Sequence, residues 1–214
     1  MAAALLEVTD LACRRGGRRV FDALSFSLAA GELLALTGRN GSGKTTLLRA
    51  LALLTPAERG GLRWAGLDAG TDREAWRARI AWLGHLDGLK GDLTVAENLV
   101  LAQRLRGATD PIDAALAAFD LAPQATRPAR TLSAGQRRRA ALARVVAAAA
   151  PFWLLDEPLN ALDAPAQMAL QRALAAHLAS GGIAIAATHA PLPGARTLSL
   201  DSSPPGKGEA EEKR

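Results

Sequence analysis

The glycine-rich stretch from Gly38 to Thr45 constrains the fold of this chain more than any other feature. It reads GRNGSGKT and fits the pattern G-x-x-x-x-G-K-[S/T]. The apolar run 32–37 before it has the composition of a buried strand, and residues 44–54 after it have that of a helix. A strand, a glycine loop and a helix in this order predict an α/β fold with a phosphate-binding loop.

This stretch, which we call the phosphate loop, combines backbone freedom with positive charge. Glycines allow the backbone to curl until successive N–H groups point at one anion, and the following helix N-terminus adds partial positive charge. We expect Lys44 to reach the β- and γ-phosphates and the Thr45 hydroxyl to ligate Mg²⁺. A turn that only packs tightly would explain the glycines but neither Lys44 nor Thr45. The predicted ATP-binding residues here are Gly38, Arg39, Asn40, Gly41, Ser42, Gly43, Lys44, Thr45 and Thr46.

Two adjacent carboxylates follow a second apolar run, in the segment PFWLLDEP at 151–158. They fall at the carboxyl end of a predicted strand, where ligands of open α/β sheets gather. We expect Asp156 to hold the Mg²⁺ and Glu157 to polarise the attacking water as general base. Such a pair is also common as a helix cap, and the phosphate loop upstream favours the catalytic interpretation.

Two histidines differ in their context. His189 follows the apolar strand 183–187 and Thr188, so it lies at the same sheet edge as Lys44 and Glu157. A contact with the γ-phosphate is the prediction, and a structural histidine is the alternative. His177 lies within a predicted helix without such context, and we expect it to be structural.

The remaining pattern alternates strands with helices, which predicts a mainly parallel sheet with right-handed crossovers. Two runs around the Gly16-Gly17 turn predict an antiparallel pair, and Thr71/Glu74 and Thr94/Glu97 have capping-box spacing at helix starts. The predicted strands are 6–13, 23–28, 32–37, 80–83, 152–155 and 183–187, and a long helix is predicted at 164–179. We expect one domain over 1–200, with a helical subdomain at about 86–150, and a polar, disordered tail at 201–214.

Composition limits the class of protein. No run of about 18 uncharged apolar residues occurs, so no membrane-spanning helix is expected. The start MAAALLEVTD lacks the pattern of a secretory signal, and the single Cys13 fits a reducing compartment and a filler role, so we expect a cytoplasmic location. A formal charge of +5 and a pI of 10.3 suggest an acidic partner such as nucleotide, anionic lipid or nucleic acid, although genome composition would also produce this balance.

The segment Leu132–Gln136, LSAGQ, opens a predicted helix, with Ser133 and Gln136 at capping-box spacing. Capping alone would account for these residues. The order of the phosphate loop, LSAGQ, LLDEP, Ala161-Leu162-Asp163 and Thr188-His189 nevertheless resembles the ABC ATPase family over residues 5–200. We call Leu132–Gln136 the signature segment.

The resemblance implies two cassettes facing head to tail, with ATP and Mg²⁺ as ligands. The signature segment of one cassette would close over the γ-phosphate held by the other. Asp163 matches a loop that crosses the dimer interface, and the partner would be a second copy or another cassette. The residues expected to act on the partner's nucleotide are Ser133, Gly135, Gln136 and Asp163.

Three positions depart from the family pattern. An aromatic residue that normally stacks on adenine is absent, and Arg15 is the residue offered there. His85 replaces the usual glutamine after strand 80–83; it is predicted to contact the metal water or the γ-phosphate near the membrane partner, and an exposed loop histidine is the alternative. Ala134 replaces the commoner glycine of the signature segment.

The segments WLGH, LSAGQRRR and THAPL resemble, within this family, the ATP-binding subunit of the bacterial cytochrome c maturation complex, the haem exporter. This implies a peripheral protein on the cytoplasmic face of the inner membrane, with integral membrane subunits as partners. Direct contact with haem or nucleic acid is not expected. The alternatives are the cassette of another small-solute exporter, or a soluble ABC protein acting on nucleic acid or ribosomes. Those soluble proteins carry second cassettes, coiled coils or zinc modules, for which the chain has no room.

Overall fold

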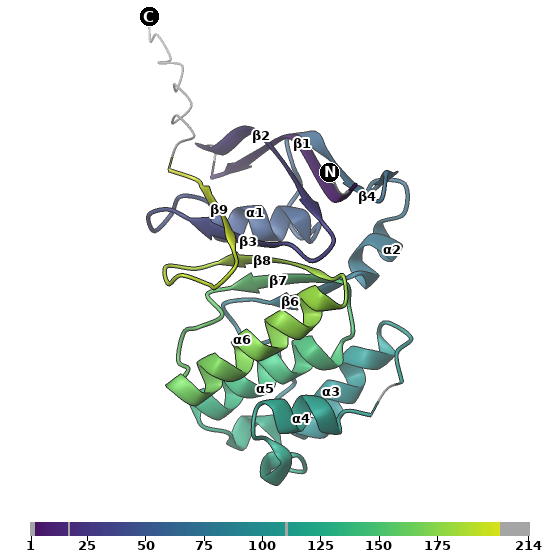
Figure 1. The fold of residues 1–214 in the computed structure, drawn as a ribbon, viewed down its shortest axis with the longest axis vertical. Helices are drawn as coiled ribbons and strands as arrows, with labels where there is room; N and C mark the ends of the chain where they lie inside the picture. The colour runs from purple at the N-terminus through teal and green to yellow at the C-terminus, as the bar shows by residue number, and fades with distance from the viewer. Residues whose placement is uncertain (1–2, 17, 110, 202–214) are drawn as a thin grey trace, which may run out of the picture.

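The computed structural model describes residues 3–16, 18–109 and 111–201, and contains two sheets. The first sheet is antiparallel, with strand order β2-β1-β4-β5. Its long strands β1 (Ala4–Arg15) and β2 (Arg18–Ala29) form the predicted antiparallel pair, and β4 (Arg59–Trp64) and β5 (Leu67–Asp68) extend it. Figure 1 shows this sheet at one end of the molecule, above α1.

The second sheet is parallel throughout, with strand order β6-β7-β8-β3-β9. Its strands are β6 (Ile80–Leu83), β7 (Phe152–Asp156), β8 (Ile183–Ala187), β3 (Leu33–Thr37) and β9 (Arg196–Ser199). Every residue of β7 and β8 is buried, as their continuous apolar runs predict. Because all five strands point the same way, the segments that follow them meet at one edge.

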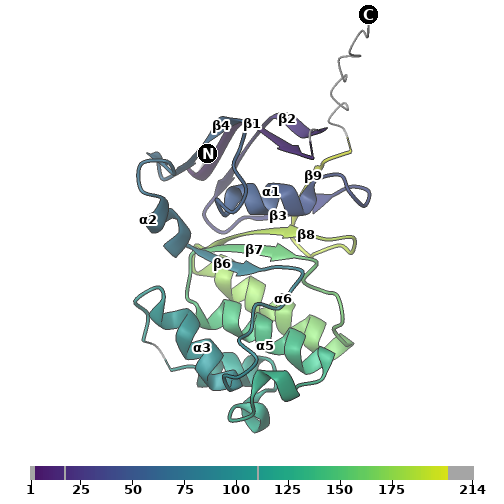
Figure 2. The same ribbon diagram turned by 180° about the vertical axis from the view of Figure 1, so that it is seen from behind.

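Helices cover both faces of the parallel sheet. Helix α1 (Lys44–Leu51) lies between the two sheets, while α5 (Ala134–Ala147) and α6 (Ala164–Ala179) cover the other face (Figure 2). Beyond α5 lie α3 (Val95–Arg104) and α4 (Asp113–Ala118), with the short 3₁₀ turns Ala122–Gln124 and Ala129–Thr131; α2 (Arg73–Ala78) precedes β6. No helix in the described ranges is long and apolar enough to cross a bilayer.

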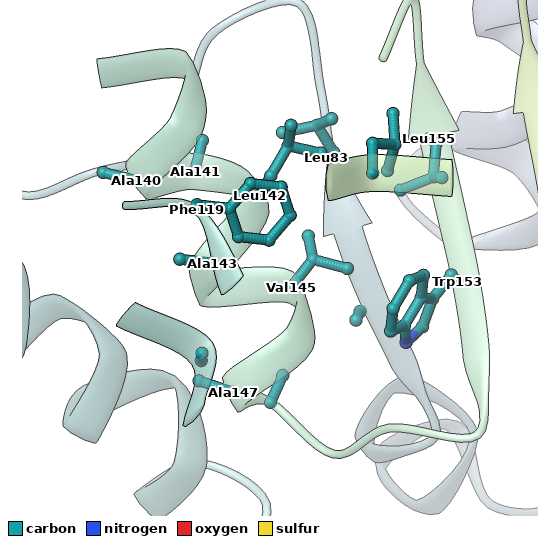
Figure 3. Close-up of a cluster of buried hydrophobic side chains, with 14 of the residues drawn as sticks. Leu83, Phe119, Ala140, Ala141, Leu142, Ala143, Val145, Ala147, Trp153 and Leu155 are labelled. Atoms are coloured by element: carbon teal, nitrogen blue, oxygen red, sulfur yellow. The ribbon is translucent and has the colours of Figure 1, made fainter. Parts of the chain in front are cut away.

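The apolar core joins this helical layer to the sheet. One cluster of buried side chains packs Leu142 and Val145 of α5 against Phe119 on one side and Leu83 and Trp153 of the sheet on the other (Figure 3). Helix α5 can lie close to the elements packed against it because its buried alanines, which include Ala140, Ala141 and Ala143, occupy little volume. A second cluster fills the space between the two sheets around α1. The position of α5 is therefore set by packing on both of its sides.

Capping boxes form at two of the three positions where the sequence has the spacing for them. Thr94 and Glu97 form the predicted capping box, and so do Ser133 and Gln136. The helix predicted to start before Trp76 is present as α2, but Thr71 is not its cap, because Asp72 caps α2 by accepting a hydrogen bond from the Ala75 N–H at 2.9 Å. A carboxylate one residue later provides a stronger acceptor for the first-turn N–H groups.

Sequence patterns missed β4, β5 and β9, because glycines and charged residues interrupt their alternation. The predicted helix 44–54 also ends earlier, at Leu51. Residues 202–214 of the predicted tail lie outside the described part of the chain. Asp201, the first residue assigned to that tail, contacts the phosphate loop.

Candidate functional site

The phosphate loop follows β3 and turns directly into α1. Gly38, Gly41 and Gly43 have φ values of 136°, 83° and 102°, which favour glycine over every other residue. A Cβ atom on Gly43 would also lie 2.3 Å from Cγ1 of Val20. Gly43 is the N-cap of α1 and provides no side-chain cap, so the positive end of the helix faces the loop.

Lys44 and Ser42 suit the loop to phosphate. The Lys44 ammonium is buried, and it donates to the carbonyl oxygens of Gly38 at 2.8 Å and Arg39 at 3.2 Å. The Ser42 hydroxyl is buried and has no hydrogen-bond partner. A phosphate in the loop would supply the acceptor that the Ser42 hydroxyl lacks and would balance the buried charge of Lys44, and leaving either need unmet is costly.

Thr45 and Asp156 come together although 111 residues separate them in the sequence. The Thr45 hydroxyl lies 3.0 Å from Oδ2 and 3.1 Å from Oδ1 of the Asp156 carboxylate. Asp156 is 3% exposed, whereas Thr45 is exposed to solvent. A hydroxyl beside a carboxylate offers the oxygen ligands that Mg²⁺ takes, so the residues present fit this ion.

Glu157 follows β7 in a strained backbone conformation, with φ of 47°. Its N–H donates to the carbonyl of Ala187 at 2.9 Å, so its backbone is held against β8. Its Oε1 lies 3.4 Å from Nε2 of His189, and the side chains are 23% and 54% exposed. This pair is close to solvent, where a substrate and a water molecule could reach it.

One cavity of about 380 Å³ brings half of the predicted site residues together. Lys44, Thr45, Asp156, Glu157 and His85 all line it. His85 is exposed, as its alternative interpretation proposed, but it faces the same cavity as the carboxylates. The arrangement can hold a polyphosphate beside two carboxylates and His85, with His189 next to Glu157 but not on the described lining.

The signature segment is not part of this cavity, whose described lining contains neither Ser133, Gly135, Gln136 nor Asp163. Ser133 caps α5, accepting from the Gln136 N–H at 3.2 Å, and Asp163 caps α6, accepting from the Ala166 N–H at 3.0 Å. Ser133 and Asp163 are exposed, and a Cβ atom on Gly135 would lie 3.7 Å from the carbonyl oxygen of Ala161. The two segments are therefore adjacent at the surface. The Arg15 side chain lies outside the described residues, so its predicted stacking on adenine stays a prediction.

Two residues beside the site were missed from the sequence. Asp201 accepts hydrogen bonds from the Arg39 N–H at 2.9 and 3.2 Å, which ties the phosphate loop to the end of β9. Arg138 is buried behind the carboxylates; burial lowers its pKa and the nearby Asp87 opposes this shift. No signal in the sequence separates Arg138 from its neighbours in the run Arg137–Arg139, and Asp201 lies in a polar segment.

A phosphate loop on a parallel sheet, with an antiparallel sheet on one side of α1 and a helical layer opposite, is the architecture of an ATP-binding cassette. The chain belongs to the ABC transporter family, whose model matches residues 21–160. It is an ATP-binding and ATP-hydrolysing transporter subunit, as the order of its motifs predicted.

Curated relatives match over nearly the full length. The chain is 48% identical to the cytochrome c biogenesis ATP-binding export protein CcmA of Rhodospirillum rubrum, covering 98% of this chain and 91% of that protein. It is 46% identical to the protein of the same name from Cupriavidus necator, covering 92% and 88%. The predicted resemblance within the ABC family is confirmed by these matches.

Solved structures agree with the fold. An ATP-binding subunit of an ABC transporter aligns with a TM-score of 0.81 at 27% identity, covering 86% of this chain and 80% of that one. A putative ABC transporter ATP-binding protein from Pyrococcus furiosus aligns with a TM-score of 0.81 at 21% identity, covering 92% and 98%. At 21% identity the second match supports the fold alone.

Proposed function

We propose that this chain hydrolyses MgATP to drive a haem exporter of cytochrome c biogenesis. The observation that carries the chemistry is the single cavity lined by Lys44, Thr45, Asp156, Glu157 and His85. The observation that carries the particular role is 48% identity over 98% of the chain to a cytochrome c biogenesis ATP-binding export protein.

The phosphate loop binds the triphosphate. Its N–H groups and the positive end of α1 surround the phosphates, and Lys44 exchanges its two carbonyl partners for β- and γ-phosphate oxygens. Thr45 and Asp156 hold Mg²⁺, which neutralises phosphate charge when bound.

Glu157 acts as general base. Its carboxylate accepts the proton of a water molecule placed in line with the γ-phosphate, and His189 beside it donates to a γ-phosphate oxygen. His85 lines the same cavity and orients either that water or the phosphate.

A complete site requires two cassettes. Ser133 is the N-cap of α5 and is exposed, so the positive end of this helix suits an anion held by another subunit. Since the signature segment and the segment at Ala161–Asp163 are adjacent, one surface of each cassette covers the phosphate loop of its partner. A homodimer satisfies this arrangement with identical chains.

Replacing Ser133 with arginine should abolish hydrolysis in the dimer while leaving nucleotide affinity of the separated monomer unchanged. The added side chain blocks the partner's γ-phosphate but lies outside the cavity of its own chain. ATPase rate against protein concentration, together with nucleotide titration at low concentration, measures the two effects. Equal loss of monomer affinity would contradict the composite site, as would wild-type rates that stay strictly proportional to protein through dimerisation.

The partners proposed are integral membrane subunits, with this chain bound peripherally on the cytoplasmic face of the inner membrane. Substrate contacts then lie in those subunits, and neither haem nor nucleic acid touches this chain.

Purification from detergent-solubilised membranes should recover this chain with small integral membrane proteins and without ribosomes or nucleic acid. Mass spectrometry identifies the companions, and a nuclease-treated sample is the control. Recovery with a membrane protein of unrelated transport function would favour another small-solute exporter. Recovery with ribosomes would contradict a transporter role.

A further inference from the structure

Arg138 is a buried charge that the nucleotide site does not use. It lies in the second turn of α5 and is 5% exposed, and it is absent from the described lining of the phosphate-loop cavity. Burying a guanidinium is costly unless its donors are satisfied. Its contacts therefore indicate what the charge does there.

The guanidinium of Arg138 joins α5 to two segments that are distant in the sequence, the loop after β6 and the end of β7. Nη1 donates to the carbonyl oxygen of Gly84 at 3.1 Å, and Nη2 donates to the carbonyl of Asp156 at 2.9 Å and to that of Glu157. Asp87 completes the contact, with Oδ1 3.5 Å from Nη1. One side chain of α5 thus holds both the loop after β6 and the end of β7.

The carbonyls it holds belong to the backbone that aims the reactive groups. The peptide of Glu157 is fixed on both sides, by its N–H to Ala187 and by its carbonyl to Arg138. Gly84 immediately precedes His85, so the same guanidinium restrains the backbone from which the His85 side chain extends. The positions of both groups consequently depend on the position of α5.

The N-terminus of α5 lies on the surface that would meet the partner cassette. Ser133 caps α5 and would meet the nucleotide of the partner cassette, while Arg138 lies five residues further along the same rigid helix. A shift of α5 on closure therefore moves both ends together.

We propose that Arg138 is a positioning residue that couples the two nucleotide sites of the dimer. When the signature segment closes on the partner's ATP, Arg138 draws Glu157 and the His85 loop of its own chain into alignment. Hydrolysis in one site then requires ATP in the other. This inference rests on the proposed function, in particular on the composite dimer and on Glu157 as base.

Arg138→Lys tests this coupling with the charge retained. An ammonium carries all its donors on one nitrogen, whereas the guanidinium reaches Gly84 with one nitrogen and Asp156 and Glu157 with another. We expect kcat to fall about tenfold, with KM for ATP within about twofold of wild type. The Hill coefficient for ATP should fall from about two toward one, because the sites no longer communicate.

Arg139→Lys is the matched control. Arg139 is the next residue of α5, but it turns toward α4, donating to the Phe119 carbonyl at 3.2 Å with Asp120 at 3.7 Å. Its variant should keep the wild-type kcat and Hill coefficient. Asp87→Asn provides a milder second variant, with kcat lower by about threefold and reduced cooperativity, should Arg138→Lys fail to fold.

Steady-state ATPase assays over ATP concentration, with thermal unfolding of each variant, decide the question. An unchanged Hill coefficient in folded Arg138→Lys, a change in KM alone, or an equal loss in Arg139→Lys would overturn the coupling role. A wild-type protein without ATP turnover would contradict the proposed function, whereas wild-type turnover with a normal Arg138→Lys variant contradicts this inference alone.

Discussion

Glu157→Gln should bind ATP as wild type does and nearly stop hydrolysing it, with kcat lower by roughly 10²- to 10⁴-fold. Glutamine keeps the shape of the side chain but cannot take the proton of the attacking water. The Glu157 backbone and the metal ligands stay in place, because the Glu157 N–H bond to Ala187 and the Thr45 contact with Asp156 do not involve the changed carboxylate; only the contact with His189 does.

An ATP-bound dimer should accumulate in this variant, since closure no longer ends in hydrolysis. Phosphate release measures turnover, and gel filtration with and without MgATP measures dimerisation. Glu74→Gln, on the exposed first turn of α2, is the control and should behave as wild type. Full turnover by Glu157→Gln would rule out Glu157 as the base.

Lys44→Ala should eliminate the function of the whole complex in the intact organism. Its ammonium is the buried cation of the phosphate loop, and its loss removes charge stabilisation from the β- and γ-phosphates. It also leaves the carbonyls of Gly38 and Arg39 without their donor. We expect the ATPase rate to fall by roughly 10²- to 10³-fold.

If the proposed role in cytochrome c biogenesis holds, c-type cytochromes should disappear as a class in a Lys44→Ala strain, and other haem proteins should remain. Haem staining of denatured membrane proteins gives the result directly, and immunoblotting checks that the variant accumulates. Arg49→Ala, on the exposed side of the same helix α1, is the matched control. Normal c-type bands in the Lys44→Ala strain would disprove the haem-exporter role and leave the ATPase assignment untouched.

Local sequence determined the parts of this protein whose chemistry depends on neighbouring residues. The phosphate loop is readable because Gly38, Gly41 and Gly43 need positive φ and Lys44 follows at once. The capping box at Ser133 and Gln136 spans a single helical turn, and the apolar runs that end at Asp156 and just before Thr188 mark one sheet edge. Such patterns act over a few residues, so composition and spacing suffice.

Tertiary structure alone decided which distant groups meet. Arg138 reaches Gly84 across 54 positions and Asp156 across 18, and Asp201 reaches Arg39 across 162. The edge strand β9 was likewise missed, because it is defined by its pairing with the distant strand β3 and its four residues show no clear apolar alternation. These contacts form only when the packing of α5 and the order of the parallel strands bring the groups within hydrogen-bonding distance, and no pattern of neighbouring residues encodes that distance.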